Sequence, residues 1–570
     1  MRPHNLIKFL KILFVAFQAT YVFGQSYFPE VGREAIFQSS LDLQSNLRVL
    51  QVALQPGYED LATLAYFRLN RGARIMSAYV TNGEAGESDV RGEYPFELAA
   101  KRREEATEVM ASLEADAYFL NMPDVVSASD TSKLRSEWGG DSLQTLLMKL
   151  ISDFKPDLIL LSRDFEFGVA SPRWQYVRDQ LLNAVKNLRV MHPRKGPPLP
   201  RWAVERVVGD NATDKGVRAP VTSEHPLWKT SYMAIAEEVA HGYKSLEKQR
   251  SLWKSIDGAP YQVIYPVPSK RMKTVEENLP RAVSPSLRWL ERETKRLAEA
   301  ATSGRDVISL SRSRTVRVPS RLVVLLDSVD YRLAFAQQLN PSMRRTLVDW
   351  KASLENLRST LLGIRVQYSF SETILTEKQL TFVTIDSVVG VSEEGKTEIL
   401  FPAVNQGWVL NEYIEPRLPL QLHVPYRLLS PGKLESDVPH ALYGLKKATV
   451  GNPFYFFILH KSISKEQSFT YRVKLNLYYA PRFTTEILTP IVRIIPQERV
   501  VLKLTSHSRD KVRDTLAVND SLAVSNPILF RLDKKESSHL DTLFITWRGN
   551  MADGTYLLPV RIGIYTVARF

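Results

Sequence analysis

Cysteine is absent from all 570 residues of this sequence. Its absence excludes disulfide bonds, cysteine nucleophiles and an N-terminal lipid of the lipoprotein kind. Beyond the N-terminus, the chain also lacks any apolar run of the ~20 residues that a membrane span requires. Stability must therefore come from hydrophobic cores. Domains of about 100–200 residues predict three or four of them in a chain of this length.

Acidic residues are outnumbered, because 75 lysines and arginines face 62 aspartates and glutamates and leave a formal net charge of +13. This excess favours anionic glycans or lipid headgroups through long-range attraction. The basic residues are scattered, however, and never alternate with aromatic residues as they do in nucleic-acid grooves. We therefore expect no nucleic-acid partner.

Residues 1–24 have the composition of a secretory signal peptide. Arg2, Lys8 and Lys11 precede the apolar run 12–17, and the small residue Gly24 follows. A charged start, a short apolar stretch and small residues before the cut are typical of such peptides. The apolar stretch is too short for an uncleaved membrane anchor. We expect cleavage after Gly24, no transmembrane span, and export to the periplasm, the cell surface or the medium.

Short apolar runs alternate with helical patterns between residues 47 and 190. Strands are expected at 47–54, 73–81, 117–120 and 158–161, with helices at 59–70 and 97–113. Such alternation predicts an α/β domain whose parallel sheet is covered on both faces. Parallel sheets bind ligands at the carboxyl ends of their strands. Functional residues are therefore expected in the loops after Leu54, Thr81, Asn121 and Ser162.

The remainder of the chain divides into a connecting part and a β-rich part. Residues 192–226 are predicted to be mostly irregular, and helices are expected at 231–253, 285–301 and 331–361. After residue 362, runs such as 380–385 and 471–478 alternate with period two, which favours antiparallel sandwiches. The predicted organisation is a signal peptide at 1–24, an α/β domain at 40–260, a mostly helical region at 261–362, a β-sandwich-like region at 363–497 and a β module at 498–570, with joints near Pro416 and Glu498.

Two loops and one helix of the α/β part form recognisable motifs. Residues 49–60, VLQVALQPGYED, are similar to a strand that leads into the motif Ala-His-Pro-Asp-Asp-Glu. Residues 81–86, TNGEAG, are similar to a Thr-x-Gly-x-x-Gly turn, and residues 98–106, LAAKRREEA, match Leu-Ala-x-x-Arg-x-x-Glu-Ala. In this order, the three motifs resemble those of the PIG-L (LmbE-like) zinc N-deacetylases.

Two further segments carry the resemblance to about residue 255. Residues 156–160 have the form of the strand that precedes the second metal motif of the family. Ser231 and Tyr232, with residues 243–245, resemble a helix that contains His-Lys-Ser-Gln in large exported members. The resemblance implies a Rossmann-like deacetylase fold for residues 40–260 and an ancestral activity on N-acetylated amino sugars.

The resemblance also implies a zinc site, and this sequence departs from it. In the family two histidines and an aspartate hold the metal, which polarises the amide carbonyl and acidifies a water, while a carboxylate acts as base. Here the first ligand falls on Gln55, the base on Gly57, the second ligand on Tyr58 and the third on Trp174. Glutamine, tyrosine and tryptophan are poor zinc ligands. We therefore expect no cofactor, with zinc only if its ligands have moved.

The predicted binding cleft has two interpretations that the sequence leaves open. Its aromatic, amide and guanidinium groups could form a sugar-binding surface. Alternatively, Tyr58 and Trp174 could fill the space that the metal has vacated. In the family, the arginine and glutamate that correspond to Arg102 and Glu105 support the site. The cleft candidates are Gln55, Tyr58, Glu59, Thr81, Arg102, Glu105, Arg173 and Trp174.

Other polar residues offer weaker sites. His192, His225 and His241 are the histidines that could replace lost ligands, although surface or capping roles are the more common ones. Asp164 and Glu166 have the chemistry of a glycosidase couple but are more typical of a solvated loop. Gly83 and Gly86 could bind phosphate, yet a tight turn with positive φ explains them better. The remaining acids near the loops are Asp60, Glu84 and Asp124.

These observations predict an exported deacetylase-fold pseudoenzyme that binds a glycan, an amino sugar or a protein partner of the cell envelope. One alternative is an active metal-dependent N-acetyl-amino-sugar deacetylase with relocated ligands, in which His225 or His241 lies close to Glu59 or Asp60. A second alternative is a structural or assembly protein that acts through its β modules.

Overall fold

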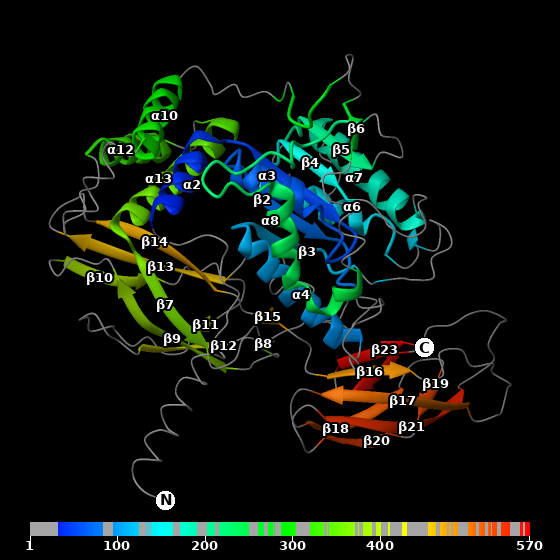
Figure 1. Ribbon diagram of the computed structural model, residues 1–570. Coiled ribbons are helices and arrows are strands. Elements are labelled where there is room, and N and C mark those ends of the chain that lie inside the picture. Colours follow the sequence, from blue (N-terminus) through cyan, green and yellow to red (C-terminus); the bar gives the residue numbers. More distant parts are fainter. Residues whose placement is uncertain are drawn as a thin grey trace, which may run out of the picture.

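The computed structural model describes most of the N-terminal two thirds of the chain and, beyond residue 370, mainly its strands (Figure 1). The described residues are 32–83, 95–122, 124, 134–135, 138–162, 171–190, 202–210, 216–249, 260–266, 272–277, 279, 287–303, 320–335, 339, 341–370, the strands named below, 468 and 527. The predicted signal peptide and the joints near Pro416 and Glu498 lie outside them. Among the described residues, no helix has the length and apolar character needed to cross a membrane.

A mixed, mainly parallel sheet of six strands organises the first half of the molecule. The strand order is β3-β2-β1-β4-β5-β6, and only β6 runs antiparallel to its neighbour. The order reverses between β1 and β4, so the loops after these two strands leave the sheet side by side. The strands are β1 (Arg48–Ala53), β2 (Arg74–Tyr79), β3 (Asp116–Phe119), β4 (Leu158–Leu161), β5 (Arg206–Asp210) and β6 (Tyr261–Tyr265).

Each face of the sheet is covered by its own set of helices. Val49 and Ala53 of β1 belong to one core, whereas Leu50 and Val52 belong to the other, because successive side chains of a strand point to opposite faces. The first core contains α3 (Leu61–Leu69), α4 (Pro95–Ser112), α8 (Tyr232–Val239) and the 3-10 turns η1 (Ala240–Gly242) and η2 (Lys244–Gln249). The second contains α6 (Ser142–Phe154) and α7 (Pro172–Val190).

Two strands of this sheet differ from the sequence predictions. β5 lies within residues 192–226, a range whose composition predicts mostly irregular structure, and β6 lies just beyond the predicted domain boundary at residue 260. Both are short, and glycine and proline residues surround them in the sequence. Their pairing with β4 and with each other supplies the hydrogen bonds that a short strand cannot satisfy locally.

A second helical body combines the first described helix with helices about 250 residues later. The predicted helix at 331–361 is in fact two, since Pro341 begins a new one. Ile36 and Leu43 pack with Leu290, Leu326 and Trp350 in one apolar core. The members of this helical cluster are α2 (Arg33–Gln44), α10 (Arg288–Ser303), α12 (Ser320–Ala334) and α13 (Pro341–Leu362).

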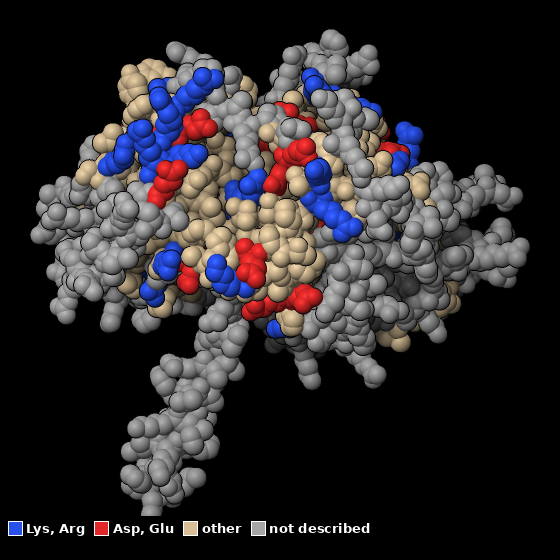
Figure 2. Space-filling view, turned by 45° about the horizontal axis from the view of Figure 1, so that its top comes forward, with Lys and Arg blue, Asp and Glu red and all other residues tan. Residues whose placement is uncertain are grey.

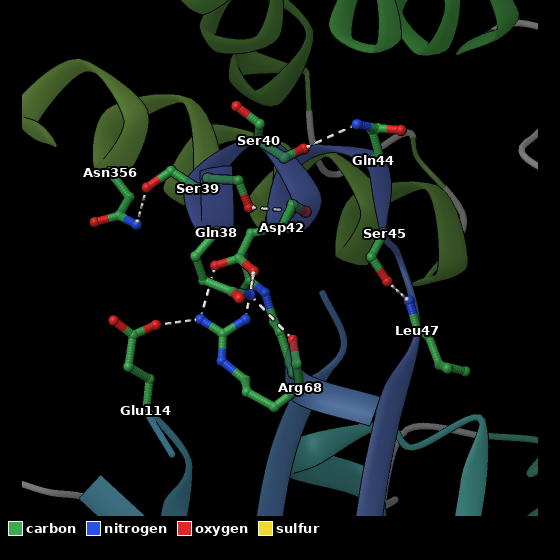
Figure 3. Close-up of polar contacts among 12 residues, drawn as sticks. Gln38, Ser39, Ser40, Asp42, Gln44, Ser45, Leu47, Arg68, Glu114 and Asn356 are labelled. Atoms are coloured by element: carbon green, nitrogen blue, oxygen red, sulfur yellow. Dashed lines mark hydrogen bonds and ion pairs between the residues drawn. The ribbon is translucent and has the colours of Figure 1, made fainter. Parts of the chain in front are cut away.

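Ion pairs centred on the buried side chains of Arg68 and Asp349 hold the helical cluster to the sheet. Figure 3 shows Arg68 of α3 between Asp42 of α2 and Glu114, which lies two residues before β3. The Nη1 of Arg74 lies 2.7 Å from Oδ1 of Asp349 in α13, a carboxylate that also accepts from Arg48. Arg48 and Arg74 are the first residues of β1 and β2. The helical cluster therefore lies at the amino ends of the strands, opposite their functional ends.

The C-terminal third consists of small, largely antiparallel sheets. Their orders are β11-β12-β9-β7, β10-β13-β14, β16-β17-β21-β19 and β20-β18-β22-β23, with a short parallel pair β15-β8. The first two contain β7 (Arg365–Phe370), β9 (Leu380–Val389), β10 (Gly395–Leu400), β11 (Val409–Leu410), β12 (Val424–Leu429), β13 (Phe454–Ser462) and β14 (Phe469–Leu475). The pair is β8 (Ile374–Leu375) with β15 (Tyr478–Tyr479). The last two contain β16 (Phe483–Ile487), β17 (Val500–Ser508), β18 (Val512–Val518), β19 (Ala523–Ser525), β20 (Ile528–Leu532), β21 (Ser537–Trp547), β22 (Pro559–Ile562) and β23 (Tyr565–Arg569).

Candidate functional site

The loop between β1 and α3 holds Gln55, Gly57 and Tyr58, three of the residues that the resemblance aligns with the family's metal site. A turn closes from the Tyr58 amide to the Gln55 carbonyl at 3.2 Å, and Gly57 adopts a φ of 88°. That positive φ suits glycine and strains most other residues. Gln55 is buried, and Tyr58 is half-buried against both cores of the sheet.

Asp60 is the last residue of this loop and caps the N-terminus of α3. Its Oδ1 accepts from the Thr63 amide at 2.9 Å, which is the N-cap bond of α3, and its Oδ2 accepts from the Tyr261 hydroxyl at 2.6 Å. Tyr261 is the first residue of β6. The Asp60 carboxylate therefore joins the start of a helix to the edge strand of the sheet, and its oxygens are occupied by these contacts.

Glu59 is a buried carboxylic acid surrounded by tyrosine hydroxyls. It accepts hydrogen bonds from the Gly57 amide at 2.8 Å, from the Tyr79 hydroxyl at 3.2 Å and from the Tyr243 hydroxyl. Burial raises the pKa of Glu59 to about 7, against the lowering effect of these hydrogen bonds. The same burial raises the pKa values of both tyrosines. We call Glu59, Tyr79 and Tyr243 the acid–tyrosine cluster.

The turn after β2 is tied to α4. The Thr81 hydroxyl donates to the Leu54 carbonyl at 3.1 Å, and Gly83 has a φ of 73°, which confirms the prediction of a turn with positive φ. Arg102 is completely buried and donates to the Gly83 carbonyl. A Cβ atom on Gly83 would lie 2.7 Å from the Arg102 guanidinium. The turn and the helix therefore pack too closely for a side chain at Gly83.

Glu105 of α4 holds a segment that is distant in the sequence. Its carboxylate accepts from the Ser245 amide at 2.9 Å and from the Ser245 hydroxyl at 2.6 Å. Burial raises the pKa of Glu105, although both bonds oppose that shift. Because Ser245 is two residues from Tyr243, Glu105 also positions a member of the acid–tyrosine cluster. The supporting role that the resemblance implies for Arg102 and Glu105 stays a prediction.

The segment that the resemblance aligns with the family's second metal motif lies at the start of α7. The Ser171 hydroxyl accepts from the Trp174 amide at 3.1 Å, and the Trp174 indole N–H donates to the Ser162 carbonyl at 2.7 Å. Trp174 is 6% exposed and lies in the second core, against which Tyr58 also packs. The Ser162 hydroxyl accepts from Gln51 of β1 at 2.8 Å. Ser162 thus connects the two strands at which the chain order reverses.

Arg173 forms a buried ion pair with Asp124. Its Nη1 lies 3.1 Å from Oδ1 of Asp124, and both side chains are almost fully buried. A buried arginine and carboxylate of this kind neutralise each other. The pair links the start of α7 to the segment after β3.

The described histidines of this half of the chain have hydrogen-bond partners within their own loop or helix. The Nδ1 of His225 accepts from the Trp228 amide at 3.2 Å, and its ring stacks on Trp228 at 4.0 Å. Burial lowers the pKa of His225 to about 4, so the ring is neutral. The Nδ1 of the exposed His241 lies 2.7 Å from the Glu237 carbonyl oxygen on the preceding helical turn. His192, Glu84, Gly86, Asp164 and Glu166 lie outside the described residues.

The side chains at the former ligand positions do not fit zinc. The Trp174 indole offers an N–H donor and no lone pair, and that donor is already bound to Ser162. Glu59 has both oxygens engaged by hydrogen bonds from its neighbours. Among the residues that the structure describes, no group of three or more His, Asp or Glu side chains could hold a metal ion.

The sequence pointed to loops that meet at this site, but it did not indicate two of the side chains at the centre of the site. Tyr79 and Ser162 were not among the candidates, and Tyr243 entered only through the resemblance. Tyr79 is the last residue of β2, where an inward hydroxyl could have been suspected, since strand ends of a parallel sheet point at the ligand site. The contacts of Tyr243 depend on a chain segment 184 residues from Glu59 and carry no local signal.

Comparison with known families identifies this region. The model of the PIG-L family, described as GlcNAc-PI de-N-acetylase, matches residues 61–166. Those residues form a PIG-L domain. The match begins directly after the loop that contains Gln55 and Tyr58 and ends before Trp174, so it covers the scaffold between the two former motifs. No curated protein matches the chain.

Several solved structures are similar to part of the chain. They include N,N'-diacetylchitobiose deacetylase from Pyrococcus horikoshii, at 14% identity and a TM-score of 0.30, covering 39% of this chain and 87% of that one. A conserved protein from Thermus thermophilus has 17% identity and a TM-score of 0.29, covering 40% and 100%. The 4-carboxy-2-hydroxymuconate hydratase from Pseudomonas putida has 15% identity and a TM-score of 0.28, covering 40% and 99%. Similarities at these TM-scores say nothing about function.

Proposed function

We propose that this protein is an exported PIG-L-fold pseudoenzyme that has lost zinc-dependent deacetylation and acts by binding a glycan or a partner of the cell envelope. The observation that carries the proposal is the state of Trp174. It stands at a position that resembles a zinc ligand, yet it is buried, and the only polar atom of its side chain is bound to the Ser162 carbonyl.

The rest of the site supports the same proposal. Of the cleft candidates, only Tyr58 is half-buried, whereas the other seven are at most 7% exposed. Such burial favours the interpretation in which aromatic side chains fill the former metal space. The contacts of Asp60, His225 and His241 within their own surroundings weigh against an active enzyme with relocated ligands.

Export rests on the sequence of residues 1–24, and it would place the protein where envelope glycans are available. The C-terminal sheets, as sandwich-like modules, would then serve partner association. Secretion is tested by N-terminal sequencing of the protein recovered from its host, with a mature N-terminus after Gly24 expected and an intact N-terminus contradicting it.

The decisive measurement for the pseudoenzyme is metal content. We would load the purified chain with zinc, dialyse it extensively, and determine zinc per chain by mass spectrometry beside an active PIG-L deacetylase as the positive control. The expected result is no retained zinc and no acetate release from N-acetylated amino sugars. About one zinc per chain, together with acetate release, would overturn the proposal.

A further inference from the structure

An open groove of about 680 Å³ lies in the helical cluster, where α10 meets α12. Large apolar side chains line it and remain exposed, with Trp289 at 45%, Val324 at 56%, Tyr331 at 70% and Phe335 at 49%. Single exposed apolar residues are ordinary, but several in one hollow mark an interaction site. The cluster's own core is already formed by other residues of these helices, Leu290, Leu322 and Leu326 among them.

Polar side chains alternate with the aromatic ones along the groove. Asp327 precedes Tyr331 by one helical turn, and Arg332 follows it directly. The rings of Tyr331 and Phe335 meet edge to face with centroids 5.4 Å apart, which leaves the Tyr331 ring largely exposed. Flat apolar rings beside hydrogen-bonding groups suit sugars, because pyranose rings present apolar faces and hydroxyl edges.

Basic residues are exposed on α10 beside the groove, to which this helix contributes Trp289. Arg288, Arg292 and Lys295 are exposed, and Arg292 lies one helical turn from Trp289. Figure 2 shows lysine and arginine side chains gathered on the upper left of the view, over the helical cluster. Glu293 on the same helix is already paired with Arg296 at 2.8 Å and with Arg321. The exposed charge of α10 is therefore net positive, while Glu299 is an exposed acid on the same helix and the exposed Asp327 lines the groove itself.

We propose that the α10–α12 groove binds an anionic polysaccharide, with Trp289 and Tyr331 stacking on sugar rings and the basic face of α10 pairing with their negative groups. The inference rests on the proposed binding function and names a site and a ligand class for it. A concave aromatic surface can stack on successive sugar rings of a polysaccharide. Binding to a bilayer instead requires side chains that protrude from the surface. The site lies at the opposite end of the sheet from the acid–tyrosine cluster.

The test measures binding of the full chain to polygalacturonate, with uncharged dextran as the reference, by isothermal titration calorimetry at low and physiological salt. We expect binding to polygalacturonate and at least tenfold weaker binding to dextran. The double variant Trp289→Ala/Tyr331→Ala should lose at least tenfold in affinity. The variant Arg292→Gln/Lys295→Gln should also bind more weakly and depend less on salt, since fewer charged pairs remain to be screened.

Val348→Ala is the matched control, because Val348 is a 44% exposed apolar residue of the same cluster that does not line the groove. Its affinity should equal that of the parent. Unchanged binding by the Trp289/Tyr331 variant would overturn the proposal, as would absence of polygalacturonate binding, stronger binding to anionic vesicles, or occupation of the groove by a second copy of the chain in solution. Zinc retention decides the pseudoenzyme proposal separately, so the two failures can be told apart.

Discussion

The site at the carboxyl ends of the strands (the carboxyl-end site) and the α10–α12 groove differ in how far their side chains are buried and bonded within the protein. At the carboxyl-end site, the acid–tyrosine cluster, Trp174 and Arg173 are buried, and each has a partner within the protein. In the groove, aromatic side chains remain exposed, and basic residues of α10 are exposed beside it. The site that the family motifs mark is therefore filled by its own side chains. The groove, which no motif marks, has exposed surface that a ligand can contact.

The comparison teaches that a motif position and a binding surface need not coincide. Polar backbone groups are buried at the strand ends, and buried groups must be satisfied from within the protein. Trp174 and Glu59 meet that need here. A residue that fills such a place contributes to stability, whereas an exposed residue in a groove contributes little to stability. Substitutions in the two regions should therefore separate the two roles.

The largest effect is expected for Trp174→Ala. Removing this buried indole leaves a cavity and an unpaired Ser162 carbonyl, so the free energy of unfolding should fall by about 3–5 kcal/mol. The paired substitution Trp289→Ala, at a 45% exposed tryptophan, should cost under about 1 kcal/mol. Guanidinium unfolding of both variants checks this. Comparable stability of the two proteins would contradict the assignment of Trp174 to the core.

A substitution of Asp349 tests the connection between the sheet and the helical cluster that contains the groove. The substitution Asp349→Ala leaves Arg48 and Arg74 without their shared carboxylate and should lower the free energy of unfolding by about 3 kcal/mol. The control is Asp330→Ala, which removes the exposed ion pair with Lys351 and should cost under about 1 kcal/mol. If the two variants unfold at the same denaturant concentration, the buried ion pairs do not hold the helical cluster to the sheet.

The acid–tyrosine cluster makes stability depend on pH. The folded pKa of Glu59 is about 7, above its ordinary value of 4.5, so the folded state binds the proton more tightly than the unfolded state. The contribution of Glu59 is therefore fully present below pH 4.5 and is lost as the pH rises to about 7, a change of about 3 kcal/mol.

His225 acts in the opposite direction, because its folded pKa of about 4 lies below its ordinary value of 6.5 and stability is lost as the pH falls between them. The difference between the parent and Glu59→Gln isolates the Glu59 effect. Unfolding should be followed at about pH 5 and about pH 8, on either side of the folded pKa of Glu59. A difference that does not change between these pH values would show that Glu59 is not a buried acid.

The smallest of these stability effects concerns Gly83→Ala. Its φ of 73° and the Arg102 guanidinium 2.7 Å from the added Cβ should together cost about 1–3 kcal/mol. Gly140→Ala is the control, since Gly140 has a φ of 64° but no atom within 4 Å of the added Cβ. The excess cost at Gly83 measures the close packing against Arg102. Equal costs at both glycines would mean that only backbone strain matters.

Much of the α/β scaffold follows from local patterns. The strands β1, β2, β3 and β4 and the helices α3 and α4 lie where apolar runs and helical spacing predicted them, because burial on both faces imposes these patterns on the sequence. The motif 98–106 pointed to the PIG-L domain, which the family match confirms at residues 61–166. Gly83 was also predictable, because few other residues tolerate its backbone conformation.

The tertiary structure decided what these elements contact. The pKa of Glu59 is raised to about 7 because packing buries it, and one of the residues around it, Tyr243, lies in a segment that a local pattern cannot connect to it. No local pattern indicates that α2 packs with α10 and α13, or that Trp289 and Tyr331 line one groove. Periodicity records which face of an element is buried, whereas the partner on that face is chosen by packing between segments that lie hundreds of residues apart.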